Sequence, residues 1–566
     1  MSEVIWSPGW REQQINKLRL QPEEKQWDLV IVGGGITGAG VLREATRRGL
    51  KVLLVEQKDF AWGTSSRSSK MVHGGLRYLG SGQIGLTLES VKERQRLLTE
   101  VPGLVKPLNF LMGHYKGGFP GPFIFNVLLT IYDFMAGKRN HRFIKTAVKD
   151  FFAPGMNSTN LKGATQFADA VTDDARLVLR VLHEANKEGG VALNYVSAQD
   201  TVRENGRVTG LKLKDEVSGV SFEVTAKAVV NASGAWTDEL RSNLGVDAVI
   251  RPLRGSHLVV PSWRLPTAYS VSFFHPKDKR PVFAFPWEGV TVLGTTDLDH
   301  QQNMKKDASI TQEEVDYLLE GVNLQFPEAN ITEKDVISSY SGVRPVVGTG
   351  ALNPSSEKRE HSIWDDQGLI SVAGGKLTTF RLIALDVLKG VEKHIPSLDV
   401  NSGDACIFKE TSAIDGELVK KSGLSSYHIK RLEGRYGAAA ASIVQQTATY
   451  EAEGATCIAK TIATTDTLFS ELRWALENET VVHLEDLLLR RTRLGLLLKN
   501  GGETLFDRLK PLCKAILGWD EATWNSELSD YKQLIVLHYG LPSSASPSSG
   551  LSCAGAQKAS QAAVAL

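Results

Sequence analysis

Three short stretches of the sequence combine glycines with hydroxyl or basic side chains, a combination typical of sites that hold anionic ligands. The first contains Gly33, Gly35 and Gly38 in the pattern G-x-G-x-x-G. In this pattern the glycines permit a tight turn, let the backbone approach a pyrophosphate and allow the following helix to pack closely. Glu56, at the end of the next apolar run, can accept a hydrogen bond from a ribose hydroxyl. The stretch predicts a dinucleotide site without naming the dinucleotide, and a purely structural glycine turn is the alternative.

The second stretch, Thr64–Tyr78, reads TSSRSSKMVHGGLRY and follows closely on the first. It crowds five small hydroxyls, four basic side chains and a pair of glycines into one segment. Small polar residues beside a glycine turn suit a loop that wraps closely around a polyanion. We therefore predict that this loop contacts the cofactor, and a surface loop without a special role is the alternative.

The third stretch, Ala373–Phe380, reads AGGKLTTF and repeats the order of apolar strand, glycines and helix. A helix N-terminus there would direct N–H groups, together with Lys376, at developing negative charge. A reduced flavin carries such charge at its N1/C2-carbonyl end, whereas a nicotinamide ring becomes neutral on reduction. The stretch therefore favours a flavin as the cofactor, with a second structural glycine turn as the alternative.

Basic residues near predicted strand ends form a candidate substrate site. They are Arg77, Arg254, His257, Arg344, Arg359 and Lys376. Several converging cations would suit a phosphate or carboxylate substrate, which arginine binds through two parallel hydrogen bonds, whereas each cation taken singly is an ordinary solvated charge. Removing hydride from an alcohol carbon also requires a base for the hydroxyl proton, and His73 and His257 are the histidines in the candidate stretches.

Alternating strands and helices must position these residues. The strand–turn–helix–strand unit occupies Asp28–Glu56, and further short apolar strands follow along the chain. This order predicts an α/β fold with a Rossmann-type FAD-binding domain, a β-rich substrate domain and a helical C-terminal domain. The expected boundaries are 1–26 for a polar lead-in; 27–105, 165–250 and 340–399 for the discontinuous FAD-binding domain; 106–164 and 251–339 for the substrate domain; 400–541 for the helical domain; and 542–566 for a disordered tail.

The segment Phe119–Lys145 contains an apolar stripe at helical spacing, followed by a basic cluster. The stripe comprises Phe123, Ile124, Val127, Leu128, Ile131, Phe134 and Met135, and the cluster comprises Lys138, Arg139, His141, Arg142 and Lys145. Such a segment suits a helix lying in a membrane interface, where its cations meet anionic headgroups. An ordinary amphipathic helix packed on its own domain is the alternative.

The composition is that of a globular protein of two or three domains. A formal net charge of +1 over 566 residues gives no overall field for nucleic acid. The four cysteines are scattered without metal-ligand spacing, which favours a reducing compartment over a secreted disulfide framework. No uninterrupted apolar run reaches about 18 residues, so we expect neither a transmembrane helix nor a signal peptide.

Several motifs together resemble one enzyme family. They are GGGITGAG with Glu56, TSSRSSKMVHGGLRYL, VTDDARLVLR, NASGAW, GSHLVVP, LGTTD, YSGVRP and GGKLTTFR, in order from about Trp27 to Arg381. In these motifs, and more weakly in LLLRRTRLGLLL of the C-terminal region, the chain resembles the aerobic, quinone-linked, FAD-dependent glycerol-3-phosphate dehydrogenases. That family belongs to the flavin oxidoreductases that resemble D-amino acid oxidase, and the resemblance implies the same fold here.

The resemblance implies oxidation of sn-glycerol 3-phosphate to dihydroxyacetone phosphate, with hydride transfer to FAD and electrons passed to a membrane quinone. Catalytic roles would fall on Arg77, His73, His257, Arg344 and Lys376, and substrate contacts on Arg77, Tyr78, His257, Arg344, Lys376 and the loosely matching Arg359. FAD contacts would fall on Gly33, Gly34, Gly35, Ile36, Thr37, Gly38, Glu56, Thr64, Ser65, Ser66, Ser68, Ser69, Lys70, His73, Gly74, Val196, Ala232, Gly234, Gly374, Gly375, Lys376, Leu377 and Thr378. The family also implies a cytoplasmic location, peripherally on the anionic inner face of the cell membrane. The oligomeric state stays open, with a homodimer among the options.

These motifs leave other functions open. A glycerol-3-phosphate oxidase, which passes electrons to oxygen and makes hydrogen peroxide, shares them. An enzyme that oxidises amines or amino acids would share the fold, although the basic residues favour a phosphate. A membrane-associated binding protein that keeps FAD as a structural group is the alternative from another class.

Overall fold

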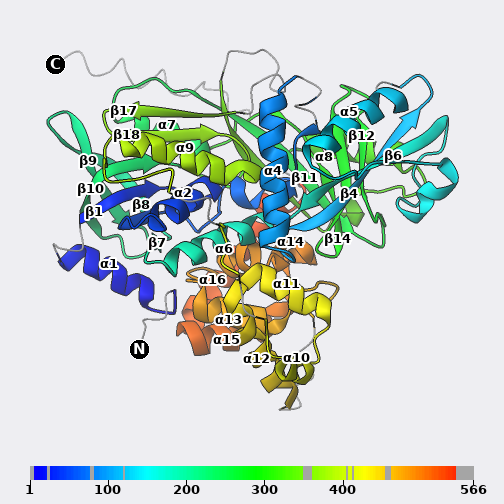
Figure 1. The fold of residues 1–566 in the computed structure, drawn as a ribbon. Coiled ribbons are helices and arrows are strands. Elements are labelled where there is room, and N and C mark those ends of the chain that lie inside the picture. Colours follow the sequence, from blue (N-terminus) through cyan, green and yellow to red (C-terminus); the bar gives the residue numbers. More distant parts are fainter. Residues whose placement is uncertain are drawn as a thin grey trace, which may run out of the picture.

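The computed structural model describes residues 6–21, 26–76, 79, 82–118, 121–348, 360–402, 406–410, 413–452 and 461–542. Two β-sheets lie side by side, and a group of helices from the C-terminal part of the chain packs beneath them (Figure 1). The chain passes between the two sheets several times before it enters these helices. Residues from distant parts of the sequence therefore meet at the junction of the two sheets.

The first sheet is eight-stranded and carries both glycine turns. Its strands run in the order β17-β18-β10-β1-β2-β7, and the hairpin β8–β9 extends from β10. Their bounds are β1 Gln26–Val32, β2 Val52–Val55, β7 Val191–Leu193, β8 Val196–Glu204, β9 Arg207–Asp215, β10 Ser221–Asn231, β17 His361–Asp366 and β18 Leu369–Gly374. Strands β18, β10, β1, β2 and β7 run parallel, so their carboxyl ends meet at one edge of the sheet.

Three helices form a layer against this sheet: α2 (Ile36–Thr46), α6 (Asp174–Asn186) and α9 (Phe380–Glu392). α2 packs between α6 and α9, and the three share one hydrophobic core with the strands (Figure 1). All of β2 and the Leu29–Ile31 stretch of β1 are buried in that core. Parallel strands covered in this way need apolar runs, which explains why the first glycine turn follows an unbroken stretch of Leu, Val and Ile.

The second sheet is ten-stranded and mostly antiparallel, in the order β15-β11-β14-β13-β12-β4-β6-β3, with β16 added on β11 and β5 on β6. Its bounds are β3 Met71–Val72, β4 Lys106–Tyr115, β5 Arg142–Ile144, β6 Leu161–Val171, β11 Ile250–Pro261, β12 Ser270–Phe274, β13 Pro281–Trp287, β14 Val290–Gly294, β15 Leu298–Asp299 and β16 Ser338–Val347. The short helix α7 (Thr237–Ser242) packs against β8 and β18, and α8 (Gln312–Gln325) packs against β11 and β14.

The strands divide between the sheets differently from the predicted domain boundaries at three places. Strands β3, β6 and β16 belong to the second sheet, whereas the predicted boundaries assign residues 71–72, 165–171 and 340–347 to the FAD-binding domain. Short buried strands of both sheets have the same apolar composition, so the sequence of a strand does not reveal which sheet it joins.

The C-terminal helices are α10 (Gly416–Ser422), α11 (Ser426–Tyr436), α12 (Ala440–Ala452), α13 (Phe469–Asn478), α14 (Leu494–Leu497), α15 (Phe506–Leu517) and α16 (Glu521–Leu534). Buried ion pairs fasten them to the first sheet: Asp59 accepts from Arg490 Nε at 2.5 Å and from Arg491 Nη1 at 2.6 Å. Although burial opposes ionisation, these two guanidinium charges lower the pKa of Asp59 to about 2. The arginines of LLLRRTRLGLLL are therefore paired inside the protein.

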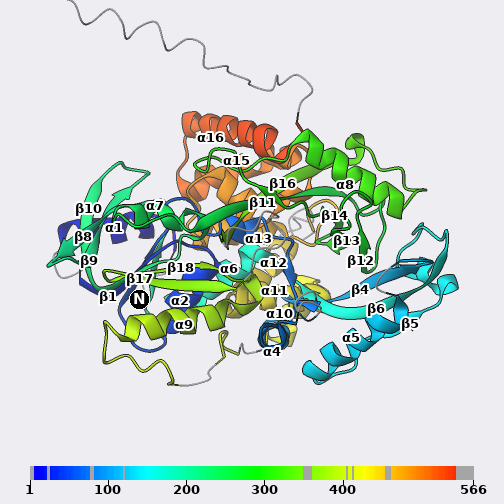
Figure 2. The same cartoon turned by 90° about the horizontal axis from the view of Figure 1, so that it is seen from above.

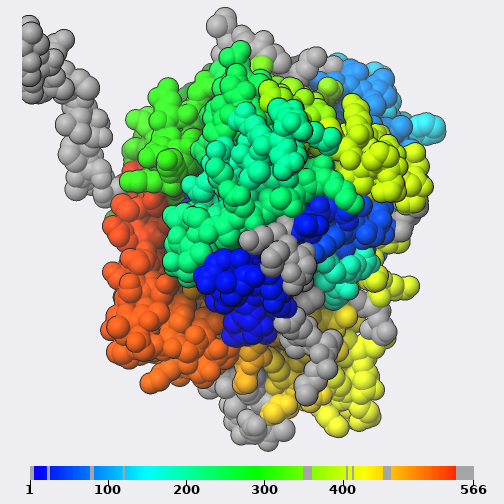
Figure 3. Space-filling model, turned by 90° about the vertical axis from the view of Figure 1, so that its left-hand side faces the viewer, coloured from blue at the N-terminus to red at the C-terminus, as the bar shows by residue number. Residues whose placement is uncertain are grey.

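The N-terminal segment, which the sequence predicts to be a polar lead-in, forms helix α1 (Trp10–Leu20). Trp6 and Trp10 are buried in the core of the first sheet, and the Arg11 guanidinium donates to the Asn194 carbonyl and pairs with Asp215. Figure 3 shows α1 lying on the surface, against segments of the first sheet and close to the C-terminal helices. Two tryptophans and one arginine thus attach a segment whose overall composition is polar.

Two further helices flank the second sheet, α4 (Ile84–Glu100) near its junction with the first sheet and α5 (Pro122–Met135) farther out (Figure 1 and Figure 2). α4 crosses the front of the molecule in Figure 1, and α5 packs on β6. None of the helices in the described residues combines the length and the apolar character that crossing a bilayer requires. The predicted tail, 542–566, lies outside the described residues apart from its first position.

Candidate functional site

The cofactor candidates gather at the carboxyl edge of the parallel sheet. Gly33 follows β1, Glu56 follows β2, Ala232 follows β10 and Gly375 follows β18. These four strands are neighbours, so turns from residues 33 to 375 come together at one edge. Ligands of open α/β sheets bind at this edge. Val196, which begins β8, is joined to the same edge because its N–H donates to the Glu56 carbonyl at 2.8 Å.

The glycines of the first turn are required by close backbone approaches. A Cβ on Gly38 would lie 1.9 Å from the Gly33 carbonyl oxygen, so the helix could not pack on the turn. Gly33 has a φ of +112°, and a Cβ there would lie 2.5 Å from the Ala232 carbonyl oxygen. At the start of α2, Glu56 Oε2 accepts from Gly34 N at 2.7 Å and Ser65 Oγ accepts from Ile36 N at 3.0 Å. Thr37 follows in the first turn of the helix, whose N–H groups point toward the edge.

The loop from Thr64 to Lys70 lies over the paired strands β11 and β16. A Cβ on Gly342 of β16 would lie 2.5 Å from the Arg67 carbonyl oxygen, which shows how closely the loop crosses the strand. Two hydroxyls of the loop hold it against neighbouring elements. Thr64 donates to the Val343 carbonyl of β16, and Ser68 Oγ donates to Asp174 Oδ2 of α6 at 2.8 Å. Ser66 Oγ donates within the loop, to the Trp62 carbonyl.

Lys70 is completely buried beneath this loop. Its ammonium donates to Asp174 Oδ1 at 2.9 Å and to the Ser66 carbonyl at 3.0 Å, and it lies over the Tyr340 ring. Burial, together with the nearby charge of Arg493, lowers the pKa of Lys70 to about 8. The Lys70 side chain thus holds the loop against α6 through Asp174, and its contact with the cofactor stays a prediction.

The second glycine turn leads into α9 and meets the loop that contains His73. Gly374 and Gly375 both have positive φ, and a Cβ on Gly374 would lie 2.5 Å from the Glu360 carbonyl oxygen. Thr378 Oγ1 accepts from His73 N and donates to His73 O, each at 3.2 Å. The two stretches that the sequence singles out, with Gly74 in one and Leu377 in the other, are thus tied together directly.

Lys376 projects from this turn and is mostly buried. Its ammonium donates to Ser90 Oγ of α4 at 3.1 Å. Burial lowers the pKa of Lys376 to about 8, because the charges of Glu89 and Glu360 compensate only in part. An anionic ligand that bound beside this buried ammonium would stabilise its charged form.

His257 lies on β11 of the second sheet, and its side chain faces the Thr64–Lys70 loop. The register places it opposite Tyr340 of β16, and the two rings stack with centroids 4.5 Å apart. Its Nε2 lies 2.9 Å from Ser69 Oγ, and its Nδ1 has no hydrogen-bond partner among the described residues. Burial, followed by the charges of Arg344 and Lys70, holds the pKa of His257 well below its ordinary value, so the imidazole is neutral.

Arg344 lies on the same face of the β11–β16 pair as His257. Its Nη1 donates to Asp297 Oδ1 at 2.7 Å and its Nη2 donates to Thr295 Oγ1 at 3.2 Å. A Cβ on Gly255 would lie 2.4 Å from Arg344 Nη2, so the guanidinium crosses the strand between Leu253 and His257. About a quarter of the Arg344 side chain is exposed, at 23%, which leaves it accessible to a ligand.

Arg254, the other arginine that the sequence places near this strand end, has a structural role. It is buried and pairs with Glu314 Oε2 at 3.0 Å. Side chains alternate along a strand, so Arg254 points to the face opposite His257 and Arg344. The predicted convergence therefore includes His257 and Arg344 but not Arg254. Arg77, Tyr78 and Arg359 lie outside the described residues.

Sequence reasoning missed the carboxylates that hold these cations. Asp297 of LGTTD is 1% exposed beside Arg344, and Asp174 of VTDDARL is buried beside Lys70. Asp169 of β6 accepts from the Gly74 N–H at 3.1 Å. The sequence holds only a weak signal for Asp297 and Asp174, since each follows closely on an apolar strand, and a carboxylate that becomes buried there must find a partner.

The residues at the sheet edge fit FAD. The close approaches at Gly33 and Gly38, with α2 starting beside them, leave room for a pyrophosphate but for no side chain. Glu56 follows β2 at the position of a ribose acceptor, and the Gly374–Lys376 turn brings the Lys376 ammonium to the other end of the edge. The Ala232–Gly234 turn, with Gly234 at positive φ, lies between them.

The comparisons with known proteins agree with this geometry. Residues 28–381 match the family model described as FAD dependent oxidoreductase, and residues 403–524 match that of the C-terminal domain of alpha-glycerophosphate oxidase. The chain is 34% identical over 495 residues to the aerobic glycerol-3-phosphate dehydrogenase of Staphylococcus saprophyticus, covering 83% of this chain and 87% of that protein. It is 35% identical over 508 residues to that of Staphylococcus haemolyticus, covering 85% and 88%.

Two solved structures are also similar. The glycerol-3-phosphate dehydrogenase from Bacillus halodurans complexed with FAD is 28% identical, with a TM-score of 0.74 over 94% of this chain and 98% of that chain. The L-alpha-glycerophosphate oxidase from Mycoplasma pneumoniae with FAD bound shares the fold, at 16% identity and a TM-score of 0.51, over 65% of this chain and 95% of that chain. The chain therefore belongs to the FAD-dependent oxidoreductases and, within them, to the aerobic glycerol-3-phosphate dehydrogenase family, and FAD is its cofactor.

Proposed function

We propose that this protein oxidises sn-glycerol 3-phosphate at C2 to dihydroxyacetone phosphate and passes the electrons to a membrane quinone. The observation that carries the proposal is that a neutral His257 and the cationic Arg344 lie on one face of the β11–β16 pair, below the loop whose Ser65 contacts the start of α2. An alcohol that bears a phosphate needs both a proton acceptor and a cation. The names of the curated relatives support the same substrate.

Arg344 binds the phosphate in this proposal. Its planar guanidinium can donate two parallel hydrogen bonds to phosphate oxygens. Asp297, nearly inaccessible to solvent, fixes the orientation of the guanidinium from behind at 2.7 Å. Because Arg280 also pairs with Asp297, at 3.2 Å, the carboxylate keeps a partner when Arg344 turns toward substrate.

His257 takes the proton of the C2 hydroxyl. Its neutral imidazole can accept a proton, and Ser69 Oγ at 2.9 Å from Nε2 fixes the ring. The phosphate brings negative charge to the site, which raises the pKa of His257 toward the range that a general base needs. Bound FAD supplies the two-electron acceptor for the C2 hydride. Lys376 stabilises the negative charge that results, and His73 remains a second candidate for the base.

We further propose that α5 attaches the protein to an anionic membrane surface, on the inner face of the cell membrane, where the quinone is dissolved. Phe123 and Phe134 are 80% and 87% exposed, and Ile124, Val127 and Ile131 are exposed beside them. Phe125, Leu129 and Tyr132 bury the opposite side of the helix against the domain. The helix thus packs on its domain with one face and presents five apolar side chains with the other, which supports the proposed attachment.

The surroundings of α5 suit such a surface. Lys138, Arg139, Arg142 and Lys145 follow the helix and are exposed, so cations lie next to the apolar face. In the view of Figure 2, α5, β5 and the ends of β4 and β6 form one end of the molecule, remote from the first sheet. Apolar side chains at one end can enter a lipid surface without disturbing either core.

The second candidate function is a glycerol-3-phosphate oxidase, because residues 403–524 match a domain named for alpha-glycerophosphate oxidase. Turnover with a soluble quinone under nitrogen, compared with turnover in air without quinone, separates the two. We expect dihydroxyacetone phosphate to accumulate in proportion to quinone reduced, with little peroxide in air. Peroxide formed in air as fast as quinone is reduced would show that the oxidase assignment is right instead.

A further inference from the structure

We propose that Asp169, Tyr132 and Arg94 are positioning residues that hold the His73–Gly74 backbone against the active site. The three come from β6, α5 and α4, and none of them belongs to the stretches that the sequence marks as chemical. All three are almost completely buried, with 5%, 1% and 3% of their surfaces exposed. The inference rests on the proposed function insofar as His73 and Gly74 are part of the site.

Asp169 is the centre of this cluster. One of its oxygens, Oδ1, accepts from Gly74 N at 3.1 Å and from the Tyr132 hydroxyl at 2.7 Å, and also from Arg94 Nη1. Arg94 Nη1 donates in addition to the Tyr132 oxygen at 3.0 Å, and its guanidinium lies over the Tyr132 ring. A buried carboxylate with three donors is fixed in place, and the Gly74 N–H is fixed with it.

Steric contacts close the same cluster around Gly74. A Cβ on Gly74 would lie 2.3 Å from the Tyr132 hydroxyl oxygen and 2.5 Å from Val91 Cγ2, so the loop passes directly against α5 and α4. On the other side, Thr378 binds both the N–H and the carbonyl of His73 at 3.2 Å. The dipeptide is therefore held between the second glycine turn and the Asp169 cluster.

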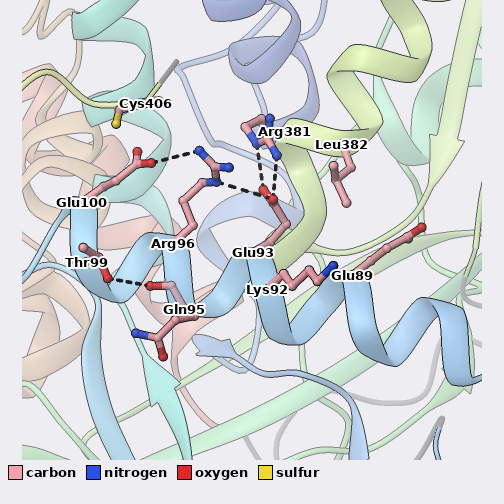
Figure 4. A pocket seen from close by; sticks show the side chains of 10 residues that line it. All are labelled: Glu89, Lys92, Glu93, Gln95, Arg96, Thr99, Glu100, Arg381, Leu382 and Cys406. Atoms are coloured by element: carbon pink, nitrogen blue, oxygen red, sulfur yellow. Dashed lines mark hydrogen bonds and ion pairs between the residues drawn. The ribbon is translucent and has the colours of Figure 1, made fainter. Parts of the chain in front are cut away.

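Helix α4 connects this cluster to the second glycine turn. Ser90 accepts from Lys376, and one turn later Glu93 accepts from Arg381 of α9 at 2.8 and 3.0 Å. Figure 4 shows the outer side of this contact, where Arg96 reaches Glu93 and Glu100 along a groove of about 570 Å³. Arg94, on the inner side of α4, thus shares a rigid element with the partner of Lys376.

Tyr132 gives the cluster a second connection. It lies on the buried face of α5, whose opposite face exposes Phe123 and Phe134. One helix therefore carries both an exposed apolar surface and a side chain that contacts the active-site backbone. Because the two faces bear different residues, each can be changed without changing the other.

The test compares Tyr132→Phe with Tyr436→Phe in the FAD-loaded protein. Tyr132→Phe removes one hydroxyl and leaves the ring in place. Tyr436 is a matched control, because it is a buried tyrosine whose hydroxyl also donates to a carboxylate beside arginines, Glu471 at 2.7 Å, but it lies in the C-terminal helices. Asp169→Asn is a second, stronger variant, since it removes the charge that Arg94 and Tyr132 share.

Two readouts are independent of turnover. Hydrogen exchange of the peptide that spans residues 71–76 should be about tenfold faster in Tyr132→Phe, because Asp169, which accepts from the Gly74 N–H, is no longer fixed by the Tyr132 hydroxyl. The visible circular dichroism of the bound oxidised flavin should also change, while FAD content stays at the wild-type level. Tyr436→Phe should alter neither signal, even if it lowers the melting temperature equally.

A third readout is the rate at which glycerol 3-phosphate reduces the flavin without oxygen. We expect this rate to fall about tenfold in Tyr132→Phe with an unchanged KM, because the substrate phosphate is bound elsewhere. Wild-type exchange and a wild-type flavin signal in both Tyr132→Phe and Asp169→Asn would overturn the inference. If wild-type protein fails to react with glycerol 3-phosphate, the proposed function fails, and the exchange and dichroism results still decide the positioning role.

Discussion

Replacing Arg344 by alanine is the substitution that tests the substrate assignment most sharply. In the proposed complex Arg344 donates two charge-assisted hydrogen bonds to the phosphate, each of which contributes about 1.5–3 kcal/mol to binding. The guanidinium already pairs with Asp297 at 2.7 Å, which reduces its field at the phosphate. We therefore take the lower half of the range, about 3–4 kcal/mol, which corresponds to a hundred- to thousandfold loss of kcat/KM.

The loss should appear in KM rather than in cofactor binding. Asp297 keeps Arg280 as a partner at 3.2 Å, so the variant should fold and retain FAD. Arg344→Lys keeps the charge but not the two-pronged geometry, and its kcat/KM should lie between those of alanine and wild type.

The matched control is Arg251→Ala, on the same strand pair. Arg251 also pairs with an aspartate, Asp299, at 2.7 Å, but Asp299 is exposed and the pair lies at the strand end. An exposed ion pair contributes about 1 kcal/mol or less to stability, so this variant should react like wild type. Steady-state kinetics with glycerol 3-phosphate and a soluble quinone give all three values. A kcat/KM for Arg344→Ala within threefold of wild type would refute the assignment of Arg344 to the phosphate.

Three further predictions concern the membrane surface and the pH. Phe123→Ser and Phe134→Ser should each weaken binding to anionic vesicles, measured by sedimentation, by about tenfold. Each removes an exposed apolar side chain whose transfer into lipid contributes roughly 1.5 kcal/mol to binding. The control Trp263→Ser, at a 76% exposed site elsewhere, should bind like wild type. The pKa of Lys376 is lowered to about 8, so its charge is present below that pH and lost above it. The value of kcat/KM should therefore decline above pH 8. Lys376→Met should lose most of the activity, and the activity that remains should not decline above pH 8. His483, hydrogen-bonded to a neighbouring glutamate, has a pKa raised to about 9 from its ordinary 6.5, so its stabilisation is complete below pH 6.5 and lost as the pH rises through 9. Melting temperatures should therefore fall between pH 7 and 9.5 more in wild type than in His483→Gln, and parallel curves would reject this coupling.

Local patterns in the sequence predict the parts of the fold that depend on local chemistry. The strand–glycine–helix units at Gly33 and Gly374 form where the sequence places them, because glycine adopts a positive φ without strain and has no Cβ to collide with a neighbouring carbonyl. The choice of a flavin over a nicotinamide is local as well, because Lys376 stands at the second turn, where a reduced flavin would carry negative charge. His257 and Arg344 come together because their strands pair in the register His257–Tyr340.

The rest depends on contacts between distant segments, which a single sequence does not encode locally. Arg254 resembles Arg344 in sequence but pairs with Glu314 inside the protein, because strand alternation turns it to the other face. The Thr64–Lys70 sequence suggests ligand contacts, but it does not reveal that Ser68 donates to Asp174 and Thr64 to the Val343 carbonyl, both far away along the chain. Likewise Trp6 and Arg11 bury a segment whose average composition is polar.

The most direct test of the central claim is the flavin spectrum of the purified protein, mixed with glycerol 3-phosphate without oxygen. We predict that the yellow absorption of oxidised FAD disappears in one turnover, that one dihydroxyacetone phosphate forms per flavin, and that glycerol or an amino acid at the same concentration leaves the spectrum unchanged. An unchanged spectrum with glycerol 3-phosphate would contradict the account and favour a protein that keeps FAD as a structural group. Equal bleaching by an amino acid would contradict the assignment of a phosphate substrate.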